Sequence, residues 1–262
     1  MTDEEWWQGR WKLTEAKWQA CTSPDLMLRF LRGRASDRKI RMFACHCCRR
    51  VWQYLVDVRS RHAIEVVEQF ADGLTSEEEL LAAHSDAVAA RGATSVDPAS
   101  IEWTDASLDH YDPDMIASYA TASCSSPLVF PPGRSWSGCY AALHVEEYVS
   151  RALAFAASKG ISDGNKTHNA IEEAEQYTQC QWLRDIFGNP FRPVMFSPEW
   201  RTDTALALAR QMYECRDFSA MPILADALQD AGCDNDDILN HCRQPGEHVR
   251  GCWVVDLVLG KK

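Results

Sequence analysis

The last quarter of the chain, residues 183–260, most constrains the fold. It opens with a strap, residues 187–193, in which Pro190 and Pro193 lack backbone donors and prevent a continuous helix. Beyond the strap, apolar residues recur at helical spacing in successive segments, separated by stops such as Gly232. The final run, residues 249–259, fits a strand or a helix by composition. We choose a helix because its neighbours are helical and Gly260 follows it.

Helical patterns also dominate the rest of the chain. From Asp37 to about Val58, apolar residues recur every three or four positions, which predicts one long helix. A capping box at residues 75–78 opens an alanine-rich helix. Prolines interrupt residues 93–136, where only a short helix near residues 114–122 is expected. We therefore predict an all-α fold, a multi-helix globular domain of packed helical hairpins with an irregular central insert.

The same patterns predict the domain organisation. Residues 1–12 form an N-terminal Trp-rich extension, and residues 13–262 form a single all-helical domain. Within that domain, residues 13–92 are the N-terminal helices, 93–136 the irregular insert and 137–262 the C-terminal helices.

Charge is unevenly distributed along the chain. The net charge is −11, yet the segment from Arg29 to Arg61 holds ten Lys and Arg against two acids, Asp37 and Asp57. From this segment and the strap we predict a partner-binding basic face: Arg34, Arg38, Arg41, Arg49, Arg50 and Arg192. An acidic protein partner is favoured, because the overall charge disfavours nucleic acid. The alternative is that these arginines pair with the chain's own carboxylates.

Cysteine usage and hydropathy predict the compartment. No signal peptide is evident, and no apolar run reaches the roughly 18 residues that span a bilayer. We therefore expect a cytoplasmic protein without a membrane partner. In that reducing compartment, most of the eleven cysteines should be free thiols.

A Cys/His pattern suggests a metal site. Cys45 and Cys48 lie at i and i+3, and His248 and Cys252 lie at i and i+4, so each pair can share a helix face. Two such pairs brought together would give the sulfur and nitrogen ligands of a tetrahedral zinc site. Zinc is the only cofactor that the sequence suggests. The alternative is that these cysteines are buried core thiols.

Two other patterns have simple structural explanations. His168 and Glu172, at i and i+4, resemble half of a carboxylate–histidine metal site, but charged residues at this spacing also mark solvated helix faces. Asp226 and Asp256 each interrupt an apolar run, so each is expected to be buried and paired, for example with Arg243.

Several long motifs resemble an uncharacterised family of proteins abundant in planctomycete bacteria. The opening motif is LTEAKWQAC followed by FLRGRASDRKIRMFACHCCRRVW, and the closing motifs are DIFGNPFRPV, PILADALQDAGC and HVRGCWVVDLVLGK. The resemblance covers about residues 13–74 and 183–262, and residues 1–12 precede its first motif. It implies an all-helical fold and no assigned activity.

From the sequence alone we expect a non-enzymatic intracellular interaction or scaffold module that binds an acidic partner through the basic face. The alternative is a zinc-binding protein or a cryptic enzyme that uses the Cys/His cluster. Phosphate-loop, dinucleotide-binding and serine-hydrolase motifs are absent, so no catalytic residue is assigned. A cysteine nucleophile with a histidine base stays open, because many Cys/His pairings exist.

Overall fold

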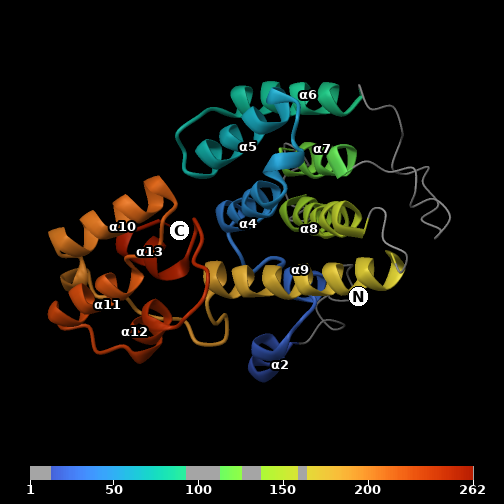
Figure 1. Ribbon diagram of the computed structural model, residues 1–262. Coiled ribbons are helices and arrows are strands. Elements are labelled where there is room, and N and C mark those ends of the chain that lie inside the picture. The colour runs from blue at the N-terminus through green and yellow to red at the C-terminus, as the bar shows by residue number, and fades with distance from the viewer. Residues whose placement is uncertain (1–12, 93–112, 126–136, 159–163, 262) are drawn as a thin grey trace, which may run out of the picture. The chain divides into compact units, whose positions relative to one another are not determined.

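A computed structural model describes residues 13–92, 113–125, 137–158 and 164–261 (Figure 1). These residues form helices and connecting loops without any strand, which confirms the predicted all-α fold. Residues 1–12 and most of the expected insert lie outside this description. The short helix expected in the insert is present as α7, Pro113–Cys124.

The chain groups into two compact units. One contains residues 21–180, and the other contains residues 13–20 and 181–262. We expected one domain from residue 13 onward. Helical periodicity runs without interruption through α9, Gly164–Phe187, so it does not show where one unit ends and the next begins. Helix α9 supplies residues to both units.

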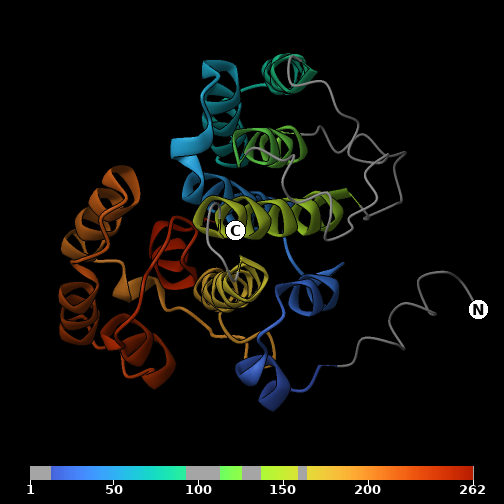
Figure 2. The ribbon, with the colours of Figure 1, turned by 45° about the vertical axis from the view of Figure 1, so that its right-hand side comes forward.

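In the first unit, helices pack both on neighbours in the sequence and on more distant helices. Its helices are α3 (Pro24–Leu31), α4 (Asp37–Arg50), α5 (Val58–Ala71), α6 (Glu77–Gly92), α7, α8 (Ser137–Ser158) and the first part of α9. Helix α7 contacts both α6 and α8, and α4 contacts α5, α7 and α8. The two ribbon views show the same order α6, α7, α8 (Figure 2).

The long helix predicted from Asp37 to about Val58 is shorter in the structure. Helix α4 ends at Arg50, a 3₁₀ turn covers residues 52–54, and Asp57 caps α5 by accepting from the Arg59 amide at 2.9 Å. The predicted apolar positions Val51 and Leu55 are nevertheless buried. The prediction was wrong because the apolar spacing indicates only which side chains are buried. A tight turn can bury the same side chains as a continuous helix.

The second unit contains a helical core around the closing segment. Its helices are α2 (Glu15–Ala20), α10 (Asp203–Cys215), α11 (Met221–Asp230), α12 (Asp236–Arg243) and α13 (Trp253–Leu259). The closing segment is a helix, as chosen, and Val254, Val255 and Val258 are buried in the core. Helix α13 contacts both α10 and α12, and its first residue follows directly on Cys252.

The strap is held against α2 by hydrogen bonds. The Trp18 indole N–H donates to the Gly188 carbonyl at 3.1 Å, and the Arg184 guanidinium donates to the Trp18 carbonyl at 3.0 Å. Gly188 has φ of 63°, and a Cβ there would lie 3.2 Å from the Trp253 ring. A glycine is therefore required for conformation and for space. These contacts fix the last turn of α9, which carries Asp185.

A buried acid lies in the first unit. Glu146 of α8 is 6% exposed, and one of its carboxylate oxygens is buried without a hydrogen-bond partner. Burial, together with the nearby carboxylates of Asp25, Glu147 and Glu172, raises the pKa of Glu146 from 4.5 to about 8. The folded protein therefore keeps this proton where an unfolded chain would lose it.

We expect the stability of the first unit to fall as pH rises from about 5 to above 8. Because the folded-state pKa of Glu146 is raised, its favourable contribution is complete at low pH and is lost through about pH 8. The slope from one such group is at most about 1.4 kcal/mol per pH unit. Urea unfolding across this range should give a flatter profile for Glu146→Gln than for the wild type. Glu173→Gln, at an exposed position of α9, should keep the wild-type slope; equal slopes for all three proteins would contradict the prediction.

Candidate metal centre

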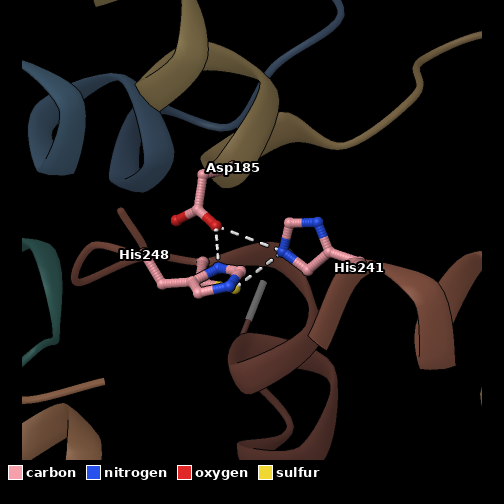
Figure 3. A group of neighbouring side chains, drawn as sticks. Asp185, His241 and His248 are labelled. Atoms are coloured by element: carbon pink, nitrogen blue, oxygen red, sulfur yellow. Dashed lines mark hydrogen bonds and ion pairs between the residues drawn. The ribbon is translucent and has the colours of Figure 1, made fainter. Parts of the chain in front are cut away.

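Four side chains of the second unit, of types that can ligate a metal, come close together. They are Asp185 in the last turn of α9, His241 in α12, His248 in the following loop and Cys252 just before α13. One ligand atom from each lies within 4.8 Å of the other three. Figure 3 shows the Asp185 carboxylate facing the ring nitrogens of both histidines.

The loop after α12 turns His248 and Cys252 back toward His241. Asn235 caps α12, and its side chain accepts from the Ile238 amide at 3.1 Å. Gly246 and Gly251 then take positive φ values of 158° and 98°. The Val249 amide donates to Asp185 Oδ2 at 2.9 Å, which joins this loop to α9.

The contacts are short and share atoms. His248 Nδ1 lies 2.6 Å and His241 Nε2 lies 3.1 Å from the same oxygen, Asp185 Oδ1. His241 Nε2 also lies 3.2 Å from Cys252 Sγ. A nucleophile–His–Asp relay needs one ring nitrogen facing the nucleophile and the other facing the acid. At His241 a single nitrogen faces both partners, so this histidine does not match such a relay.

The same convergence fits a tetrahedral ion. With zinc bond lengths, ligand atoms would lie about 3.3 Å apart for nitrogen and oxygen, and about 3.6 Å for contacts to sulfur. The three contacts of 2.6, 3.1 and 3.2 Å are somewhat shorter, as expected for groups that hydrogen-bond to each other. Side-chain movements below about 1 Å would make room for the ion.

Electrostatics leave the centre with an ionised carboxylate and a neutral thiol. Burial alone would raise the pKa of Asp185, but hydrogen bonds from His241 and His248 outweigh it and lower the pKa to about 2. Burial and the neighbouring Asp185 raise the pKa of the Cys252 thiol well above 9.0. A divalent cation would reverse the second effect, because a coordinated thiol is deprotonated.

The centre contains half of the zinc ligands predicted from sequence. His248 and Cys252 are members, whereas Cys45 and Cys48 are not. Those two belong to the first unit and are buried, with Cys45 Sγ 3.7 Å from Cys124 Sγ. Burial raises the pKa of both thiols, and their contacts match the alternative of core cysteines. They offer no evidence for a role in this centre.

Asp185 and His241 were not among the predicted ligands. Asp185 follows Leu183 and precedes Ile186, both buried, so the sequence shows it only as an acid within an apolar run. His241 lies seven residues before His248, and Pro245 and Gly246 interrupt the helical pattern between them. Only the fold of the loop shows that the four residues meet.

The predicted basic face consists of arginines that have contacts inside the chain. Four contact carboxylates: Arg38 with Asp72, Arg49 with Glu68, Arg50 with Glu175 and Arg192 with Glu15. The other two lie over aromatic rings, Arg34 over Phe30 and Arg41 over Phe70. These contacts favour the alternative of internal pairing, and binding of an acidic partner stays a prediction.

The remaining candidates have local contacts. His168 Nε2 lies 3.8 Å from Glu172, and its ring packs against Phe155. Asp226 pairs with Arg243 at 2.8 Å as expected, but it is exposed, because its apolar neighbours face the other side of α11. Asp256 is fully buried, as expected.

Among the helices that the structure describes, none has the length and apolar character needed to cross a membrane. Comparisons of the chain with protein-family models, with curated proteins and with solved structures give no match. The argument for function therefore starts from the geometry of the metal centre.

Proposed function

We propose that the second unit is a zinc-binding module in which one ion joins the end of α9 to the closing segment of the chain. The observation that carries the proposal is the convergence of Asp185, His241, His248 and Cys252 within 4.8 Å. The ligands come from α9, α12 and the loop that leads into α13. An ion would therefore join segments of the chain that are separated by the 55 residues between Asp185 and His241.

The ligand set selects the metal. One sulfur, two imidazole nitrogens and one carboxylate oxygen are the usual ligands of zinc, whereas calcium and magnesium prefer oxygen alone. Iron and copper proteins share some of these ligands, so the metal content of the purified protein is the direct test.

The role that fits the centre is structural. Catalytic zinc sites keep one coordination position open to water or substrate, while structural sites are closed by four protein ligands. Here four protein ligands are present, and the side chains of Asp185, His241 and His248 are each less than 10% exposed. Cys252 is fully buried. The proposal therefore assigns the ion to stability of the second unit rather than to catalysis.

The test is metal analysis of the full-length protein purified without an affinity metal. We expect about one zinc per chain, removed by a strong chelator together with a fall in melting temperature. Cobalt(II) added to the stripped protein should give the absorption of a tetrahedral ion with one thiolate ligand. Failure to take up zinc or cobalt, with an unchanged melting temperature in excess zinc, would refute the proposal.

A further inference from the structure

His241 faces the metal centre with one ring nitrogen and Gln244 with the other. Its Nε2 is the atom directed at Asp185 and Cys252, and its Nδ1 lies 3.3 Å from the amide nitrogen of Gln244. Gln244 is an exposed residue that caps the C-terminus of α12, with its own backbone N–H bonded to Asn240 O at 2.8 Å. This bond fixes the Gln244 backbone beside His241.

The orientation of the Gln244 amide corresponds to one tautomer of the His241 ring. With the amide nitrogen toward the ring, Nδ1 of His241 accepts and the ring hydrogen lies on Nε2. That N–H then donates to Asp185 Oδ1, which also accepts from His248 Nδ1 at 2.6 Å. The centre is thus self-consistent as a hydrogen-bonded cluster, with the N–H of His241 in the place of an ion.

A bound metal requires the opposite tautomer. Nε2 can ligate an ion only through its lone pair, so the ring hydrogen must move to Nδ1. An Nδ1–H would face the N–H group of Gln244, two donors in contact. Rotation of the amide by half a turn replaces the donor by the Oε1 acceptor and restores the hydrogen bond.

We propose that Gln244 is a positioning residue of the zinc centre, whose amide selects the His241 tautomer and rotates when the ion binds. The inference rests on the proposed function, because it assumes that His241 is a ligand. The site then has two matched states. In one, Gln244 donates and His241 holds its hydrogen toward Asp185; in the other, Gln244 accepts and His241 ligates the ion.

The first measurement is of the tautomer itself, in the full chain with ¹⁵N-labelled histidine. Long-range proton–nitrogen correlation spectra distinguish the two ring nitrogens, and a His241→Gln variant assigns the signal. We expect the hydrogen on Nε2 in stripped protein and on Nδ1 after addition of one equivalent of zinc. In Gln244→Leu without metal, the share of the tautomer with its hydrogen on Nδ1 should rise, because Asp185 alone then holds the hydrogen on Nε2.

The second measurement is zinc affinity by competition with a chelator. Loss of an outer hydrogen bond to a ligating histidine lowers metal affinity about 10- to 100-fold, and the exposure of Gln244 places Gln244→Leu near the lower end. Gln244→Glu offers only acceptor oxygens and should raise the affinity. Two controls separate other effects: Gln211→Leu repeats the substitution on an exposed face of α10, and Asn240→Asp adds a charge at the exposed position next to His241 in the chain.

The outcomes separate the two proposals. A wild-type chain that binds no zinc contradicts the proposed function. A wild-type chain that binds zinc, with Gln244→Leu within twofold of it and the ring hydrogen of His241 on Nδ1 in both states, contradicts the role of Gln244 alone. An affinity gain in Asn240→Asp equal to that in Gln244→Glu would also contradict it, because charge would then explain the effect.

Discussion

Replacing Asp185 with asparagine is expected to destabilise the second unit even without metal, and to abolish its stabilisation by zinc. The carboxylate is buried and accepts hydrogen bonds from His248, His241 and the Val249 amide. The asparagine amide has one acceptor oxygen and one NH2 group, where the carboxylate has two acceptor oxygens. The NH2 group would face one of the N–H groups that now bond to Asp185, so a charge-assisted hydrogen bond is lost and a buried N–H stays unpaired. Such a loss costs about 3 kcal/mol.

The effect of zinc is measured separately from this cost. At a free zinc concentration about 1,000 times the dissociation constant, binding stabilises the wild-type chain by about 4 kcal/mol. Asp185→Asn should gain little from the same zinc, because one ligand of four is gone. Chemical unfolding with chelator and with excess zinc gives both quantities.

Asp226→Asn is the matched control for this prediction. It makes the same substitution in the same unit, at an acid that is 71% exposed and pairs with Arg243 on the surface. A surface ion pair contributes about 1 kcal/mol or less, so the control should keep both its stability and its response to zinc. If the two variants behaved alike, Asp185 would have no special role in the centre.

The fold was predictable from the sequence because helical periodicity and caps are local signals. Thr202 caps α10 by accepting from the Ala205 amide at 3.3 Å, directly before the apolar pattern of that helix. The end of α4 was not predictable, since Val51 and Leu55 keep the apolar spacing while the backbone turns. Grouping into two units escaped prediction because α2 packs with residues more than 160 positions away.

The metal centre was only half predictable for a related reason. His248 and Cys252 stand four residues apart, so their spacing alone marks them as candidates. Asp185 is joined to them only by long-range contacts. One is the hydrogen bond that the Val249 amide donates to Asp185 Oδ2, between positions 64 residues apart in the chain. Cys45 and Cys48 have the more conspicuous spacing, yet their surroundings are apolar and their thiols contact another cysteine. Ligand spacing nominates residues, but the surroundings decide their role.

Replacing Arg49 with glutamate is expected to destabilise the first unit by about 3–5 kcal/mol, the cost of breaking a buried ion pair. Arg49 forms two parallel bonds with Glu68, Nε to Oε1 at 2.6 Å and Nη2 to Oε2 at 2.8 Å, and Glu68 is only 4% exposed. The guanidinium also lies over the Trp52 ring at 4.8 Å. Reversal of its charge would leave Glu68 buried beside a second carboxylate. Urea unfolding measures the loss.

The same experiment decides between the two interpretations of the basic face. Arg59→Glu removes an equal charge from the same region, but Arg59 pairs with Asp57 where both side chains are more than a third exposed. This control should unfold close to the wild type. If Arg49→Glu did so too, the Arg49–Glu68 pair would not support the fold, and its guanidinium would be available to an acidic partner. A large loss confined to Arg49→Glu would instead identify Arg49 as a structural cation that pairs with the buried Glu68, so any loss of partner binding in that variant would follow from unfolding.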